Sequence, residues 1–132
     1  MGYRSEVGIV MTEYAVKKFR EAIGKIEDKA LEEKIVEMLY CAEHHFVDKE
    51  SGAEFYYWPH VKWYDASSFG YPEMQFVSKF FDTLDDDNKQ EEYFYIRLGE
   101  DFEDTEYRGE YWSNPFDMYI NHCIHFVNIN KE

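Results

Sequence analysis

The sequence predicts an α+β fold in which a mainly antiparallel sheet carries two to three helices on one face. Stretches with the two-residue alternation of strands are interleaved with stretches of helical spacing, in the order strand, one or two helices, hairpin, helix, strand. The length of 132 residues suits one domain, 1–132, and is short for two. This order matches a ferredoxin-like, split βαβ core with appended strands, and a different α+β sheet is the alternative.

The first predicted element is a strand over residues 3–11, whose odd-numbered side chains share one face. Gly8 interrupts that strand, and a glycine at such a position either weakens it or indicates a close approach by another segment. Thr12 then offers a hydroxyl that can cap a helix over residues 13–26, where apolar residues recur at helical spacing.

A second helix and a hairpin come next. Asp28 can cap a helix over residues 29–42, and residues 43–65 alternate as two strands around a turn at 50–52. Pro59 cannot donate a hydrogen bond to a neighbouring strand. We therefore expect the second strand to be kinked, bulged or at an edge there.

The remaining chain predicts one more helix and the last strands. Pro72 suits the first turn of a helix whose apolar stripe extends to Leu84. Residues 91–101 form a strongly alternating strand, and residues 105–112 can pair back on it. A final strand is predicted over residues 119–129.

The net charge of −14 is concentrated in the second part of the chain. Residues 1–81 carry 14 acidic and 10 basic side chains, a net of −4, whereas residues 82–132 carry 14 and 4, a net of −10. Proteins that read nucleic acids carry basic patches, so direct nucleic-acid binding is disfavoured. The charge favours a protein partner with a basic, nucleic-acid-binding groove. Acidity that only maintains solubility is the alternative.

Two segments, FDTLDDDNKQEE and GEDFEDTEYRGE, place twelve carboxylates between Asp82 and Glu110 against three cations. Calcium binding is disfavoured because these segments lack the alternating ligands, central glycine and terminal glutamate of a calcium loop. The remaining interpretations are a solvated helix end and strand turn, or an acidic surface that imitates nucleic-acid phosphates. The residues predicted to form such a partner-binding surface are Asp85, Asp86, Asp87, Glu91, Glu92, Glu100, Asp101, Glu103, Asp104 and Glu106.

The stretch EFYYWPHVKWYD, residues 54–65, holds six aromatic side chains and one cation. Platforms for single-stranded nucleic acid combine aromatics with a positive groove, which is missing here. On a strand, one set of these side chains packs on the helices and the other meets a second layer, a partner or water. Most are therefore expected to be scaffold. The exposed half is a candidate surface made of Trp58, His60, Lys62, Trp63 and Tyr64.

Two short clusters combine cysteine and histidine. If the segments that hold Cys41 and His44, and Cys123 and His125, were adjacent, these four side chains could surround zinc. Neither cluster has a paired metal-ligand spacing, and cysteine also serves as a small buried apolar residue, so we predict no metal site. A cysteine–histidine nucleophilic pair is disfavoured because nothing flanking either cysteine resembles an activating turn.

Motifs of the common enzyme classes are missing from the sequence, including phosphate-binding glycine loops, G-x-S-x-G and H-E-x-x-H. We therefore predict a protein that is not an enzyme and needs no cofactor. No apolar run approaches the roughly 20 residues of a membrane span, and the first residues do not resemble a signal peptide. We expect a cytoplasmic protein without membrane contact, and homodimerisation is compatible with the sequence.

The runs MGYRSEV, FYYWPHVKWYD and YFYIRLGEDFEDTEY resemble a group of small proteins encoded by bacteriophages and prophages. The likeness spans Met1–Met11 and much of Glu54–Glu106, including the KWYD element and the R-L-G-E-D strand end. The resemblance implies a phage accessory protein that acts in the cytoplasm of a bacterial host, and it implies no catalytic residue. Small acidic phage proteins of this kind often block host defence proteins, such as a CRISPR effector or a restriction nuclease.

Two alternatives stay open at this point. One is a sponge that sequesters a nucleotide-type immune signal, with aromatics stacking on the base and Arg4, Lys62 or Arg97 meeting the phosphate. The other is a small metal-binding protein.

Overall fold

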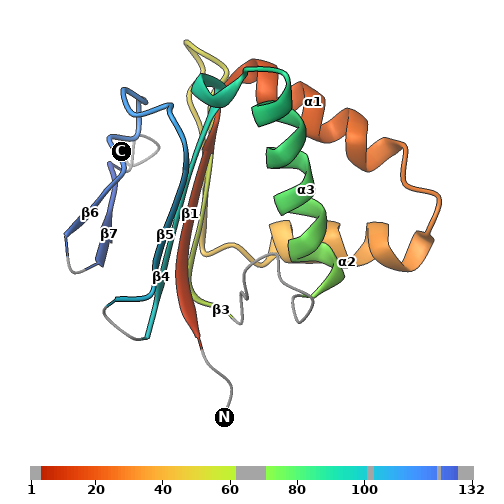
Figure 1. The fold of residues 1–132 in the computed structure, drawn as a ribbon, viewed down its shortest axis with the longest axis horizontal. Helices are drawn as coiled ribbons and strands as arrows, with labels where there is room; N and C mark the ends of the chain where they lie inside the picture. The colour runs from red at the N-terminus through yellow and green to blue at the C-terminus, as the bar shows by residue number, and fades with distance from the viewer. Residues whose placement is uncertain (1–3, 62–70, 101–102, 122, 128–132) are drawn as a thin grey trace.

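The computed structural model describes residues 4–61, 71–100, 103–121 and 123–127, and side chains are not described at 120, 121 and 123. A five-stranded antiparallel sheet lies between three helices on one side and a C-terminal segment with a small hairpin on the other (Figure 1). In chain order the elements are β1 (Ser5–Met11), α1 (Glu13–Gly24), α2 (Lys29–Tyr40), β2 (His44–Val47), β3 (Glu54–Val61), α3 (Pro72–Asp86), the 3₁₀ turn η1 (Gln90–Glu92), β4 (Tyr93–Gly99), β5 (Thr105–Gly109), β6 (Tyr119–Asn121) and β7 (Cys123–His125).

The helices begin where the sequence predicts. The Thr12 hydroxyl accepts a hydrogen bond from the backbone N–H of Ala15 at 3.3 Å, and the Asp28 carboxylate accepts one from Ala30 at 3.0 Å. Side chains of this kind satisfy backbone donors that the first helical turn leaves unpaired. Pro72 opens α3, where its missing N–H costs no helical hydrogen bond. All three predicted helices are therefore confirmed, and α1 and α2 each end two residues earlier than predicted.

The sheet has the order β2-β3-β1-β4-β5, so β1 is central and pairs with both β3 and β4. Its register shifts by one residue between Ser5 and Val7, opposite the β3 segment that contains Pro59. The bulge expected at that proline is confirmed. The α+β class with a mainly antiparallel sheet and helices on one face is also confirmed, while assignment to the ferredoxin-like group stays a prediction.

Both faces of the sheet are buried, and each has its own core. The helix-facing core combines alternate strand residues such as Ile9, Tyr56 and Tyr95 with apolar side chains of the three helices. The opposite core places Val10 and Phe55 from the strands against the C-terminal segment. This two-sided burial explains why the β3 run is aromatic at consecutive positions, since neither face of the strand meets water there.

The C-terminal layer corrects one prediction. The single strand expected over residues 119–129 is instead the short hairpin β6–β7, which forms a separate two-stranded sheet. Glu6 of β1 holds this layer to the main sheet by accepting hydrogen bonds from the Tyr57 hydroxyl and, at 3.1 Å, from the backbone N–H of Ile124. A Cβ on Gly8 would lie 2.5 Å from the Met118 sulfur, so the close approach that this glycine suggested is confirmed.

Candidate functional site

The predicted acidic surface is divided in the structure into two groups. Asp85–Glu92 lies where α3 ends and β4 begins, whereas Glu100–Glu106 lies around the connection from β4 to β5, at the other end of the sheet (Figure 1). β4 has seven residues and strands rise about 3.3 Å per residue, which separates the two groups by about 20 Å. The predicted acidic residues therefore form two separate groups, because the two segments follow each other in sequence but are joined by a full strand.

At the α3 end, some of the carboxylates have partners inside the protein. Asp85 accepts hydrogen bonds from the Tyr93 hydroxyl at 2.7 Å and from the Arg108 guanidinium at 2.9 Å. Glu92 accepts one from the Thr12 hydroxyl at 2.6 Å. These bonds tie the end of α3 and the start of β4 to neighbouring elements, so Asp85 and Glu92 have structural roles.

Three carboxylates at the same end differ from these two. Asp86, Asp87 and Glu91, which we call the α3-end acidic cluster, are exposed. Within the described part of the chain, their side chains make no hydrogen bond or ion pair. Asp86 ends α3 and Asp87 caps it, and the last turn of this helix carries no basic side chain.

The positions of Asp86 and Asp87 in this cluster are electrostatically unfavourable for α3. The C-terminal end of a helix carries the partial negative charge of unpaired carbonyl groups, so carboxylates there are repelled. Unfavourable charges at a helix end that no other contact compensates are typical of a functional surface rather than of a structural one. The cluster therefore combines exposure, unpaired charge and an intrinsic cost to stability.

At the β4–β5 end, the charges are largely neutralised by Arg97, whose side chain is only 7% exposed. Its guanidinium donates to Asp104 at 2.7 and 3.1 Å, to Glu106 at 2.9 Å and to the Ser5 hydroxyl at 3.2 Å. Burial lowers the pKa of Arg97, but the hydrogen bonds that its guanidinium donates to Asp104 and Glu106 outweigh this effect and hold the pKa above its usual range. This network joins β4 to Ser5 of β1 and to Asp104 and Glu106 at this end of the sheet.

Two other predicted acidic residues of this group are exposed. Glu103 is exposed, and the exposed Glu100 accepts a hydrogen bond from the backbone N–H of Arg4. Asp101 lies outside the described residues. The β4–β5 end is therefore a structural ion-pair network with a few exposed carboxylates beside it.

A third charged cluster was not predicted from the sequence. Glu54 is buried, and its carboxylate accepts a hydrogen bond from Arg20 at 2.8 Å and lies 2.8 Å from Nε2 of His45. Burial raises the pKa of Glu54, but the His45 hydrogen bond and the Arg20 charge outweigh it and hold this pKa below its usual value. The sequence does contain a signal for this cluster: the alternation of β3 places Glu54 on the same inward face as Tyr56, where a buried charge needs a partner.

The predicted aromatic surface is only partly described. Trp58 is buried, 4% exposed, and its indole N–H donates to the Met38 carbonyl at 3.0 Å, so its place on an exposed surface was wrong. It belongs to the helix-facing core because the alternation of β3 turns it toward α2. His60 is exposed. The other predicted members, Lys62, Trp63 and Tyr64, lie outside the described residues.

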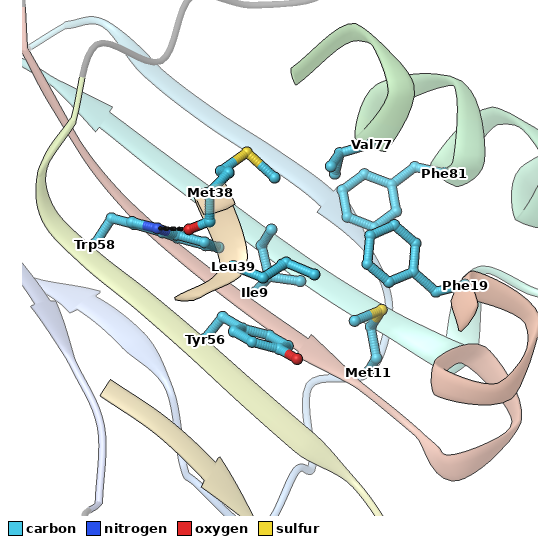
Figure 2. Close-up of a pocket in the computed structure, with 9 residues that line it drawn as sticks. All are labelled: Ile9, Met11, Phe19, Met38, Leu39, Tyr56, Trp58, Val77 and Phe81. Carbon is cyan, nitrogen blue, oxygen red and sulfur yellow. Dashed lines mark hydrogen bonds between the residues drawn. The ribbon is translucent and has the colours of Figure 1, made fainter. Parts of the chain in front are cut away.

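An apolar cavity of about 10 Å³ lies beneath the helices in the helix-facing core. Figure 2 shows its lining, which consists of Ile9, Met11, Phe19, Met38, Leu39, Tyr56, Trp58, Val77 and Phe81. Its volume is about that of one water-sized probe, and water in a cavity needs polar partners. This cavity is therefore a packing void and is far too small for a nucleobase.

Three of the four candidate zinc ligands, Cys41, His44 and His125, have described side chains, and these three are not brought together. The His44 ring contacts Tyr57 and Phe126 on the face covered by the C-terminal segment, whereas Cys41 borders a groove on the helix side. His125 stacks on Tyr119, and the Cys123 side chain is not described. Among the described residues, no three His, Cys, Asp or Glu side chains are arranged to hold a metal ion.

Comparison with known proteins identifies no relative: no family model, curated protein or solved structure matches the chain. In the part of the chain that the structure describes, no helix has the length and apolar character to cross a membrane. The α3-end acidic cluster is the candidate functional site, because its charges are exposed and have no partner among the described residues.

Proposed function

We propose that this protein is a non-enzymatic binding protein that inhibits a host protein by occupying its basic, nucleic-acid-binding groove. The observation that carries the proposal is the α3-end acidic cluster, where Asp86, Asp87 and Glu91 are exposed and have no partner among the described residues, with Asp86 and Asp87 at the negative end of α3 and Glu91 in the η1 turn that follows. Neither Arg97 nor Arg108, which neutralise other carboxylates, pairs with these three.

The overall charge supports the same kind of partner. A net charge of −14 creates a negative potential that repels nucleic acid and accelerates association with a basic surface. β4, which separates the exposed carboxylates at its two ends, is about 20 Å long, and this length corresponds to about six base-pair steps of 3.4 Å along a DNA strand. The resemblance to phage-encoded proteins suggests a CRISPR effector or a restriction nuclease of a bacterial host as the target.

The proposal is tested by capture from a bacterial lysate in three parallel arms. The first arm uses the tagged protein, the second adds competing duplex DNA, and the third uses the variant D86N/D87N/E91Q, which keeps the shape of the cluster and removes its charge. We expect a nucleic-acid-binding protein in the first arm that is lost from the other two. Capture that is equal in all three arms, or that survives in 1 M salt, would contradict electrostatic mimicry.

A further inference from the structure

A groove of about 360 Å³ lies between α2, the end of β3 and the first turn of α3. Four apolar side chains and four polar ones line it: Met38, Trp58, Val61 and Met74, with Lys34, Glu37, Cys41 and Glu73. Its volume is near the lower limit for ligand sites, which suits a single long side chain or a small molecule. Glu73 and Asp86 are thirteen helical positions apart, or about 20 Å, so this groove is separate from the α3-end acidic cluster.

One lining residue of this groove has an atom that lacks the partner its burial requires. Oε1 of Glu73 is buried beneath the groove surface, and it has no hydrogen-bond partner among the described residues. Burying an unsatisfied carboxylate oxygen is costly, so such an atom in a folded protein calls for an explanation. The positive end of α3 attracts the Glu73 carboxylate but supplies no hydrogen bond to Oε1.

The other side chains of the groove define what could satisfy this oxygen. Glu37 and Glu73 against Lys34 leave the lining with a net charge of −1, which favours a cationic ligand. The Trp58 indole N–H already donates to the Met38 carbonyl at 3.0 Å, as Figure 2 shows, so Trp58 is fixed in orientation. It therefore contributes apolar surface to the floor of the groove.

We propose that this groove binds the guanidinium-bearing side chain of an arginine from a protein partner. Guanidinium is weakly hydrated and presents several donors, so it can enter a half-buried site and donate to the Glu73 carboxylate once this side chain turns Oε1 toward the groove. The aliphatic stem of arginine matches the apolar lining formed by Val61 and Met74. The inference rests on the proposed function for one point, the choice of a basic protein as the source of the arginine.

The test is an NMR titration of the ¹⁵N-labelled protein with the blocked peptide Ac-Gly-Arg-Gly-NH₂. The matched control peptide replaces arginine by citrulline, which has a similar shape and no charge. We expect the arginine peptide to shift the Trp58 indole resonance and the amides of Cys41 and Met74 in a saturable way. In E73Q the affinity should fall about tenfold, the loss expected for a hydrogen bond to a charged group.

Two further variants make the outcome decisive. E37Q removes a charge from an exposed position of the groove and should weaken binding less than E73Q does. E37Q also replaces E73Q as the test variant if E73Q does not fold. D86N/D87N leaves the groove intact and should bind the peptide as wild type does. Equal shifts with the citrulline peptide, no saturable shift at the groove, or unchanged affinity in both groove variants would overturn the inference. Failure here leaves the lysate-capture result for the α3-end acidic cluster unaffected, and the converse also holds.

Discussion

The two ends of β4 carry similar numbers of carboxylates but use them differently. At the β4–β5 end, buried Arg97 pairs with Asp104 and Glu106, so the charges there hold the sheet together. At the α3 end, Arg108 pairs with Asp82 and Asp85, while the α3-end acidic cluster stays unpaired. A dense acidic sequence therefore does not define one surface, because the arrangement of two arginines decides which carboxylates are structural and which can meet a partner.

The largest expected effect is at the neutralised end. The substitution R97M removes a buried guanidinium and leaves Asp104 and Glu106 without their shared partner, which should lower the free energy of unfolding by about 3 kcal/mol. Urea denaturation of R97M and wild type measures this loss in the free energy of unfolding. The matched control D86N, in the unpaired cluster, should change stability by less than about 0.5 kcal/mol. Similar losses in both variants would remove the distinction between the two ends.

A smaller loss is expected for R108M, because the Arg108 side chain is 22% exposed and its partner Asp82 is 60% exposed. Partial solvation weakens such pairs, so we expect a loss of about 1 kcal/mol in the free energy of unfolding. The same substitution leaves Asp85 without its cation beside the α3-end acidic cluster. R108M should therefore bind a basic partner more tightly than wild type at low salt, and weaker binding would argue that Arg108 itself contacts the partner.

The pH dependence of the free energy of unfolding tests whether the buried Glu54 carboxylate stabilises the fold. The pKa of Glu54 in the folded protein lies below its ordinary value of 4.5, so ionised Glu54 stabilises the fold above that pH and loses this contribution as pH falls through the folded pKa. Wild type should accordingly lose stability below about pH 4.5 more steeply than E54Q, which cannot ionise at this position. Parallel profiles of unfolding free energy against pH would show that Glu54 does not contribute in this way.

The smallest expected effect is a gain. D86K replaces a repelled charge at the C-terminal end of α3 by one that the helix dipole attracts, which should raise the free energy of unfolding by about 0.5 kcal/mol. Thermal denaturation at low salt measures the gain, and E33K on the exposed surface of α2 is the control. A variant that is more stable yet binds its partner less well would indicate that the acidic residue is kept for binding. A destabilised D86K would show instead that Asp86 has a structural partner.

Much of the fold follows from the sequence, because its signals are local. The hydroxyl of Thr12, the carboxylate of Asp28 and the proline at 72 each mark a helix start, and the alternation of residues 93–99 identifies the interior strand β4. The C-terminal hairpin was missed because its two strands have three residues each, too few for a clear period.

The site was harder to predict because it depends on long-range pairing. In the sequence, Asp85, Asp86 and Asp87 are equivalent candidates for a partner-binding surface. Only the position of Arg108 on β5 shows that Asp85 forms an ion pair within the protein and that its two neighbours do not pair with this arginine. Trp58 was expected at the surface because the alternation of β3 does not tell which of its two faces meets the helices. The structure turns Trp58 toward α2, and the C-terminal segment buries the other face. Glu73 gave no signal beyond its place in the first turn of a helix, where acidic residues are common.

The most direct test of the central claim is the salt dependence of affinity for the captured partner, measured by calorimetry with the wild-type protein and with D86N/D87N/E91Q. If the α3-end acidic cluster occupies a basic groove, the wild-type affinity falls steeply between low and high salt. The variant should then bind at least tenfold more weakly at low salt, with a shallower slope. Equal affinities and equal slopes for the two proteins would contradict the account.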